Sequence, residues 1–556
     1  MRASSSPSSC RSSMDSTVSS SSSGSRSRCF CERSTWATRR TGRLSRLRSL
    51  EPRMRSEGLA RSGVISLFGS AFAALAALLL TAIVGNTLGA SGTGLFFQAM
   101  GIFTILTQVL RLGTNSGIVR FISEQRAFDR VGAEWRIVLF AAVPVAIVSG
   151  LVSLAVWFFA DALGAWLAAP TEADTLADLL RAMVPYIVMG ALIGVLQIAA
   201  RMLRGVTAFT LLQSVLLPAS RLLTVLLAVS LAGVAAWGAF EAWLWPLPVW
   251  LVITVIVVAT PLIRDFRRRA ESPPTGRPSL ASFWRFNAPR SVSSGLETAL
   301  EWSDVLIIAA VASPAAAGVY AVITRAVRAG GVVDKAMRVA VSPTISALLA
   351  RENYSESTRL HTSVVRAMIL MNWPFYMLLI AMGPAVLDIF GDEFRSGWGP
   401  MILLSLAMMF QTACGMLQSI LLQGGKSTWQ MYNKSIALAL SITGNLALVP
   451  LMGIWGAAVT WVLVVVADNM IAAVQVHRGM HVDLQPRKLV GAMIPPVVIF
   501  GGGGLLFTWW GGSSLLILLL AGVVLCLIYG VVLWLLRRLL HIESLWRRIP
   551  FVGRWA

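Results

Sequence analysis

The sequence contains few charged residues and few cysteines for its length. Only 13% of its 556 residues are charged, whereas 56% are hydrophobic, and a soluble protein of this size does not have so apolar a composition. Its five cysteines fall either in the first 31 residues or singly in two separate apolar segments, so they indicate neither a disulfide framework nor a redox site. These shortages exclude a soluble protein and predict a polytopic membrane protein.

Long apolar runs are what the sequence has in abundance. A hydrocarbon core of about 30 Å takes roughly 20 helical residues to cross. The strands of a membrane β-barrel alternate apolar and polar residues, and the apolar runs of this sequence do not. The sequence therefore predicts an all-α fold with fourteen transmembrane helices. The expected spans are 63–83, 94–115, 137–160, 182–200, 206–231, 240–263, 284–311, 316–342, 366–388, 399–422, 430–450, 453–476, 489–510 and 513–536.

Acidic residues are scarce, with 26 Asp and Glu against 47 Lys and Arg and a formal net charge of +21. The basic residues gather in alternate loops, and such loops lie on the cytoplasmic side of a membrane. The charge therefore predicts that both termini are cytoplasmic, and it does not indicate a nucleic-acid partner. Because 43 of the basic residues are Arg and Ala, Val and Gly are frequent, the codon usage favours a GC-rich bacterial genome, and we expect the bacterial cytoplasmic (plasma) membrane.

The chain is expected to consist of two related halves with additions at both ends. Residues 1–60 are rich in Ser and Arg and contain neither a core nor the apolar segment of a secretory signal, so we expect a disordered cytoplasmic tail or a start codon assigned too far upstream. Transporters built from two six-helix halves bind their cargo between the halves, near the middle of the membrane. The remaining predicted parts are an N-lobe of spans one to six (61–263), a cytoplasmic linker (264–283), a C-lobe of spans seven to twelve (284–476), spans thirteen and fourteen (477–536) and a basic cytoplasmic tail (537–556).

Spans seven and eight carry charges where a lipid-embedded helix should carry none. Glu297, Glu301 and Asp304 are spaced four and three residues apart, which places them on one helix face. A tight turn at 312–317 would make the two spans antiparallel, with Arg325 level with Asp304 and Glu301, and Arg328 level with Glu301 and Glu297. A charge at the bilayer centre costs about 2.5–3.5 kcal/mol, so these side chains should face the bundle interior or a wet cavity. These charges could form a functional site, or they could form ion pairs with a purely structural role.

Three other charges lie inside predicted spans. Arg111 on span two and Arg221 on span five have no acid at similar depth in their own half. They could face the acids of the other half or an anionic ligand, since a guanidinium donates two hydrogen bonds to phosphate, or they could extend to the inner interface. Asp468 on span twelve could take part in ion coupling or form a hydrogen bond between helices.

The sequence offers no constellation typical of an enzyme. It has no Ser/His/Asp arrangement, no cluster of metal ligands and no large outer domain that a membrane glycosyltransferase would need. We therefore expect no catalysis, no cofactor and no metal site.

Several short motifs lie at the ends of the spans and between them. Each motif is weak by itself, but their order and their positions relative to the spans are fairly specific to one family. They are LGASGTGLF (88–96), LGTNSGIVRFI (112–122), GVYA (318–321), VSPTI (341–345), IFGDEF (389–394), QGGK (423–426) and PLMGIWGAA (450–458). On these residues the chain resembles, over roughly 61–480, polysaccharide or oligosaccharide-lipid flippases of the multidrug/oligosaccharidyl-lipid/polysaccharide exporter (MOP) superfamily.

The resemblance implies two six-helix lobes with alternating access to a central cationic cavity. It implies as cargo a polyprenyl-pyrophosphate-linked oligosaccharide, moved from the inner to the outer leaflet for surface polysaccharide biosynthesis, with membrane lipids and a polysaccharide polymerase or glycosyltransferases as partners. Close alternatives are a lipid-linked peptidoglycan precursor flippase, a cation-coupled multidrug exporter and a non-transporting subunit of an export complex. The substrate-binding candidates are Arg325, Arg328, Arg221 and Arg111, and the ion-coupling or cavity acids are Glu297, Glu301, Asp304 and Asp468.

Overall fold

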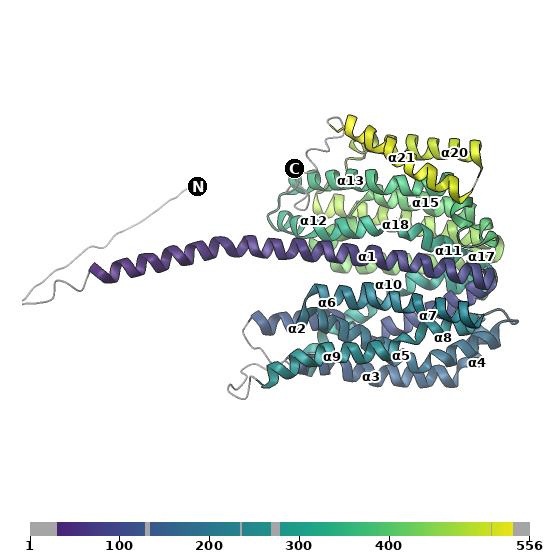
Figure 1. The fold of residues 1–556 in the computed structure, drawn as a ribbon. Helices are drawn as coiled ribbons and strands as arrows, with labels where there is room; N and C mark the ends of the chain where they lie inside the picture. The colour runs from purple at the N-terminus through teal and green to yellow at the C-terminus, as the bar shows by residue number, and fades with distance from the viewer. Residues whose placement is uncertain (1–30, 128–133, 234–235, 268–278, 513, 538–556) are drawn as a thin grey trace, which may run out of the picture. The chain divides into compact units, whose positions relative to one another are not determined.

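The computed structural model describes residues 31–127, 134–233, 236–267, 279–512 and 514–537. Two units divide the chain, Met1–Ala60 and Arg61–Ala556. Throughout the described ranges every regular element is helical, so the predicted all-α class is confirmed (Figure 1). The predicted linker 264–283 and tail 537–556 fall largely outside the described residues.

Helix α1 (Cys31–Leu110) begins well before the first expected span. Residues 31–60 of the first unit are therefore helical in the structure, which differs from the predicted disorder. Arg, Leu, Glu and Ala recur in this stretch, and all four have high helix propensity.

The first half of the second unit continues from α1 through helices that follow the apolar runs closely. A π-helical turn, η1, joins α6 and α7 within the fifth expected span. These elements are α2 (Thr114–Ala127), α3 (Glu134–Phe158), α4 (Ala160–Leu167), α5 (Ala173–Arg204), α6 (Val206–Thr210), η1 (Leu211–Leu216), α7 (Leu217–Ala232), α8 (Ala236–Leu244) and α9 (Pro246–Arg267).

A reversal at Gly89 divides α1 into the first two predicted spans. Gly89 has a positive φ of 65°, a conformation that favours glycine because it has no Cβ. The hydroxyl of Thr93 donates to the carbonyl of Val84 at 3.4 Å, although nine residues of straight helix would separate them by roughly 13 Å. The chain therefore folds back at this point.

The second half contains more and shorter elements. Its helices are α10 (Leu280–Val311), α11 (Pro314–Ala329), α12 (Val332–Ala350), α13 (Tyr354–Ala381), α14 (Gly383–Leu387), η2 (Asp392–Gly397), α15 (Trp398–Cys414), α16 (Leu417–Gln423), α17 (Ser427–Met452) and α18 (Ile454–Met480). The C-terminal elements are η3 (Pro486–Lys488), α19 (Val490–Pro496), η4 (Val497–Gly502), α20 (Gly503–Gly511) and α21 (Leu515–Leu535).

The turn between spans seven and eight lies where the sequence predicts it. Helix α10 ends at Val311, the Ser313 hydroxyl accepts a hydrogen bond from the Ala316 amide at 3.1 Å, and Pro314 opens α11. A serine cap followed by proline is a favourable helix start. The expected span 316–342 is present but bent, because α11 and α12 meet at Gly330–Gly331 with a bend of 45°, and two adjacent glycines weaken a helix at that point.

Eleven helical segments of the described chain are long and apolar enough to cross a membrane, or twelve when α11 and α12 count as one bent span. The first of them, Ile65–Arg126, has 62 residues and includes the reversal at Gly89, so it accommodates two crossings. Helix α10 is not among them because it carries three acids within its apolar part. Counting the second crossing and α10 brings the total to the fourteen predicted spans.

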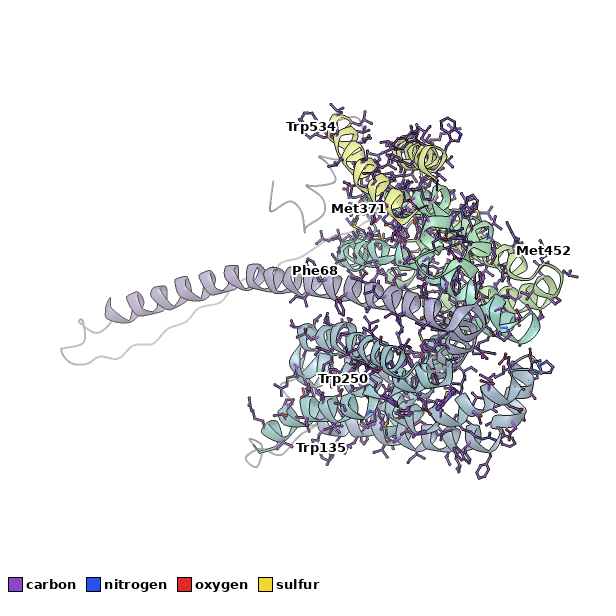
Figure 2. The ribbon with its side chains drawn as sticks, turned by 45° about the vertical axis from the view of Figure 1, so that its right-hand side comes forward. Phe68, Trp135, Trp250, Met371, Met452 and Trp534 are labelled. Carbon is purple, nitrogen blue, oxygen red and sulfur yellow. The ribbon has the colours of Figure 1, made fainter. Side chains whose placement is uncertain are left out.

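Apolar side chains point outward over these helices (Figure 2). Phe68 is 71% exposed and Trp534 is 61% exposed, values that would be costly in water but are ordinary for side chains facing lipid. The chain is therefore a multi-pass membrane protein.

The last two helices pack on the second half. Helices α20 and α21 contact each other, and both contact the α13–α14 region, beside which they lie in Figure 1. The Tyr529 hydroxyl of α21 donates to the Leu370 carbonyl of α13 at 2.7 Å, which fixes the C-terminal pair to that helix.

Candidate functional site

A polar cavity of about 200 Å³ opens between α10, α11, α15, α17 and α18. All four acids predicted as cavity or coupling residues line it, together with two basic side chains. The charged lining residues are Glu297, Glu301, Asp304, Asp468, Arg328 and Lys434. The predicted cavity acids are thus brought together in one place.

The position and charge of this cavity differ from what the family resemblance implies. Its lining comes entirely from the second half, residues 284–476, rather than from both halves. Four acids and two bases would give it two net negative charges if all were ionised, whereas a cationic cavity was expected. The reason is that the acid stripe of α10 faces α17 and α18, and α17 contributes only one basic residue to the lining.

Arg328 reaches across from α11 to Glu301 on α10, as the antiparallel register predicts. Its Nη1 lies 3.3 Å from the Glu301 Oε1, and its Nη2 donates to the Glu301 carbonyl at 3.0 Å. The two side chains are 36% and 57% exposed, and ion pairs this exposed contribute only about 0–1 kcal/mol. The pair can therefore open at little cost.

Asp304 is the most deeply buried acid of the cavity, with 6% of its surface exposed. One carboxylate oxygen accepts hydrogen bonds from Ser441 at 2.8 Å and Asn445 at 2.7 Å, and the other faces the Tyr320 hydroxyl at 3.4 Å. Neutral donors therefore satisfy this carboxylate, and the expected pairing with Arg325 is wrong.

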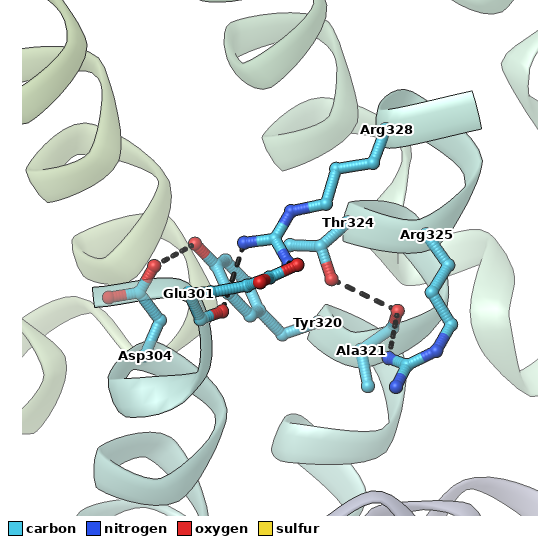
Figure 3. A network of polar contacts seen from close by, with 7 residues as sticks. All are labelled: Glu301, Asp304, Tyr320, Ala321, Thr324, Arg325 and Arg328. Atoms are coloured by element: carbon cyan, nitrogen blue, oxygen red, sulfur yellow. Dashed lines mark hydrogen bonds and ion pairs between the residues drawn. The ribbon is translucent and has the colours of Figure 1, made fainter. Parts of the chain in front are cut away.

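Arg325 turns away from the acids (Figure 3). Its guanidinium carbon lies 3.6 Å from the ring centre of Phe97 on α1 and 5.1 Å from that of Trp302, and its Nη1 donates to the Ala321 carbonyl of its own helix at 3.2 Å. Aromatic faces attract a guanidinium electrostatically. Arg325 and Arg328 are three residues apart, which separates them by about 60° around α11, enough to direct one toward α1 and the other toward α10.

Asp468 forms contacts between helices, which was one of the two roles predicted for it, the other being ion coupling. Its Oδ2 lies 2.9 Å from Lys434 Nζ on α17, and its Oδ1 accepts a hydrogen bond from Gln418 at 3.0 Å. Asp468 is 12% exposed and Lys434 is 23% exposed, so this ion pair is more buried than that of Arg328.

Lys434, Ser441 and Asn445 were not among the residues predicted from the sequence. Their spacing of seven and four residues places them on one face of α17, where they meet Asp468 and Asp304. A lysine within the apolar span 430–450, followed by two polar residues at helical spacing, was the available signal.

Arg111 and Arg221 lie in the first half and do not line the cavity. The Arg111 guanidinium occupies the space that a Cβ on Gly194 of α5 would need, and that of Arg221 lies 3.7 Å from the ring centre of Trp243. The Nε of each is buried without a hydrogen-bond partner. Among the described residues neither meets an acid, so the contact with the opposing acids is not observed, and their role as ligands stays a prediction.

Residues of the two halves meet near the break in α1. Glu393 accepts a hydrogen bond from the Ala90 amide at 2.7 Å, and Asn86 donates to the Ile389 carbonyl at 2.7 Å. By the predicted topology this contact lies on the outer side.

A second contact between the halves joins α2 to the start of α10. Arg290 donates to the Ser116 hydroxyl at 3.2 Å, and the Arg120 guanidinium lies 4.3 Å from the ring centre of Phe286. By the predicted topology this contact lies on the inner side, so the two halves touch at both ends.

Comparison with known families identifies the chain. Residues 59–349, more than half of the sequence, match the family described as polysaccharide biosynthesis protein. The chain belongs to this family. No curated protein matches this chain in sequence.

Solved structures share the fold of this family member. A structure described as "Lipid II flippase MurJ, inward closed conformation" aligns with a TM-score of 0.62 at 12% identity, over 86% of this chain and 97% of that one. An inward-facing multidrug resistance MATE family transporter of the MOP superfamily aligns with a TM-score of 0.56 at 16% identity, over 78% of this chain and 98% of that one. The Vibrio cholerae MATE transporter VcmN in its bent form aligns with a TM-score of 0.51 at 15% identity, over 76% of this chain and 98% of that one. The chain therefore shares its fold with these transporters.

Proposed function

We propose that the protein is a flippase that moves a polyprenyl-pyrophosphate-linked oligosaccharide from the inner to the outer leaflet of a bacterial cytoplasmic membrane. Membership of the polysaccharide biosynthesis family supports a lipid-linked glycan as cargo, and the fold shared with a lipid II flippase agrees with it. The observation that carries the proposal is the polar, charge-lined cavity enclosed by otherwise apolar spans. Charged side chains in such spans are expensive unless they face a wet cavity and serve transport.

The acids are assigned to ion coupling. Lys434 pairs with Asp468 and Arg328 pairs with Glu301, so Glu297 and Asp304 form no ion pair among the described residues. A cavity with surplus carboxylates attracts a proton or a sodium ion, and neutralisation of Glu297 and Asp304 by such a cation would let a pyrophosphate approach Arg328. Binding of such a cation would supply the difference between two conformations that alternating access needs.

Arg328 and Arg325 are assigned to the pyrophosphate. The Arg328 ion pair is half exposed, so phosphate oxygens can replace the Glu301 carboxylate at little cost. Arg325 lies against Phe97 of the first half, between the proposed lobes 61–263 and 284–476. Arg221 and Arg111 would join these ligands only after rocking of one lobe on the other, with the Glu393–Ala90 and Arg290–Ser116 contacts opening in turn.

An apolar groove that includes Ala326 of α11 fits the lipid tail. Its volume is about 740 Å³, and its walls come from α1, α11, α13, α14 and α21, including Ala326, Phe375, Phe390 and Leu518. A pocket of this size and apolarity is suited to isoprene units. The tail would then lie in the groove or in lipid while the sugar crosses through the polar interior.

The experiment that tests this function uses Arg325→Ala, Arg328→Ala and Glu301→Ala in cells that depend on the protein for surface glycan. We expect normal amounts of protein in the membrane, reduced glycan output and accumulation of the lipid-linked precursor on the inner leaflet. Arg359→Ala is the matched control, since Arg359 is 68% exposed and forms only a weak contact with Glu356 at 3.6 Å. Normal export by all three variants would contradict the assignment, and the precursor that accumulates identifies the glycan or reveals a peptidoglycan intermediate.

The acid-rich cavity favours one other function, that of a cation-coupled exporter of small molecules. Cationic compounds would be drawn to the same carboxylates. Deletion of the gene followed by a susceptibility screen separates the two functions. An exporter predicts greater sensitivity to cationic compounds with unchanged surface glycan, whereas the flippase predicts the reverse.

A further inference from the structure

A second buried polar cluster lies outside the cavity, where the eighth span breaks. Asp334 stands in the first turn of α12, just after Gly330–Gly331. Asn372 and Tyr376 face it from α13 and Thr412 from α15. The four side chains are between 0% and 2% exposed, which makes this the most completely buried charged site in the described second half.

The contacts within the cluster are specific. The Asn372 amide donates a hydrogen bond to the Asp334 carboxylate, and the Thr412 hydroxyl faces the same carboxylate. Tyr376 follows Asn372 by one helical turn on the same face of α13. A Cβ placed on Gly330 would lie 2.8 Å from the Tyr376 hydroxyl oxygen, so that hydroxyl reaches the break between α11 and α12.

Three oxygens of this cluster are buried and meet no partner in good hydrogen-bond geometry, although Thr412 Oγ1 faces the Asp334 carboxylate. They are Asn372 Oδ1, Tyr376 Oη and Thr412 Oγ1. Buried polar atoms are almost always satisfied, and each exception needs an explanation. A proton on Asp334 would give one new donor and could satisfy one of the three, whereas a metal cation is bound by several oxygens at once.

We propose that Asp334, Asn372, Tyr376 and Thr412 bind a sodium ion. The ligands are all oxygen, as a hard cation requires, and a single carboxylate matches a single positive charge. The charged and titratable groups that face Asp334 are Arg338 of its own helix and Tyr376. Arg338 forms no ion pair with Asp334 among the described residues, and its positive charge disfavours a divalent ion more strongly than a monovalent one. Interrupted transmembrane helices are common places for such ions in transporters.

This site is separate from the cavity but adjoins it through α15. Gln411 lines the cavity, and the next residue, Thr412, belongs to the sodium site. Occupancy of the site would therefore fix α12, α13 and α15 around the break and support one wall of the cavity. The inference does not depend on the cargo proposed above.

Thermal unfolding of the purified full-length protein in detergent tests the site. Sodium chloride would be titrated against choline chloride at constant ionic strength. A ligand that binds only the folded protein raises the melting temperature in a saturable way. We expect such a rise for the unaltered protein and at least a tenfold higher half-saturating sodium concentration for Thr412→Val and for Tyr376→Phe. Asp334→Asn should lose this saturable rise and keep only a response that is also lost when Glu297 or Asp304 is neutralised.

Matched controls use buried hydroxyls elsewhere. Thr107→Val removes a hydroxyl that bonds the Phe103 carbonyl, and Tyr529→Phe removes the one that bonds Leu370; both should keep the sodium response. Three results would overturn the proposal: no sodium response in the unaltered protein, an unchanged response in Thr412→Val and Tyr376→Phe, or a response lost in Asp468→Asn but kept in Asp334→Asn. A melting temperature that follows pH and ignores sodium would likewise overturn it, by assigning a proton to Asp334.

Discussion

The two halves of the membrane unit hold the positive charges within their spans differently. In the second half Lys434 and Arg328 meet carboxylates at 2.9 and 3.3 Å. In the first half Arg221 lies on the Trp243 ring and Arg111 fills the space left by Gly194. The second half thus pairs two of its cations with carboxylates and packs a third, Arg325, on Phe97, whereas in the described part of the chain Arg111 and Arg221 of the first half are held by packing alone.

The difference teaches where each half can respond to a ligand. An ion pair can exchange one partner for an ion or a phosphate oxygen, because the competing ligand supplies the same kind of contact. A guanidinium enclosed by an aromatic ring or a helix backbone has no partner to exchange, so it must first leave its packing. The paired charges of the second half are therefore better placed for binding in this conformation.

The largest expected effect comes from filling the space beside Arg111. Gly194→Ala would place a methyl group where three atoms of the guanidinium lie. Overpacking of a closely packed interior typically costs about 1–3 kcal/mol and occasionally more, and we expect the upper end here because Arg111 must leave its place. We expect a marked loss of thermal stability and of protein in the membrane. The control is Gly150→Ala on α3, where a Cβ meets open space; equal stability of the two variants would show that Arg111 is not held by packing.

Breaking the Lys434–Asp468 pair should have the next largest effect. Lys434→Met leaves Asp468 as a partly buried, uncompensated carboxylate, and removal of one partner from a fully buried pair costs about 3–5 kcal/mol. Because both side chains retain some exposure, we expect the free energy of unfolding to fall by about half of that amount. The loss should appear as a lower melting temperature. Asp468→Asn in the same chain should restore most of the loss, and a double variant as unstable as the single one would argue against pairing.

The smallest effect should follow from the equivalent change in the first half. Arg221→Met removes a cation–aromatic contact of about 0.5–2 kcal/mol but also removes the cost of burying an unpaired charge. We expect a change in thermal stability of about 1 kcal/mol or less, in contrast to Lys434→Met. If Arg221→Met destabilises as strongly as Lys434→Met, an acid must meet Arg221, and the contrast between the halves fails.

Part of the site was predictable because helical periodicity places residues on faces. The spacing of Glu297, Glu301 and Asp304 predicted one acidic face, and the turn after Val311 predicted that Arg328 would meet Glu301. Periodicity does not show which helix lies opposite a face. For that reason the hydroxyl and amide partners of Asp304 on α17 were missed, and Arg325 was paired with an acid instead of Phe97.

The sequence by itself determined that this is an all-helical membrane protein, since long apolar runs can satisfy their backbone hydrogen bonds in lipid only as helices. It also determined where the chain turns between α10 and α11, because a serine cap and a proline act locally. The tertiary structure alone decided that the acids face α17 and α18, that two arginines are packed without carboxylates, and that Asp334 meets Asn372, Tyr376 and Thr412. Those contacts join residues up to 141 positions apart, and their distances depend on helix packing, which local sequence patterns do not specify.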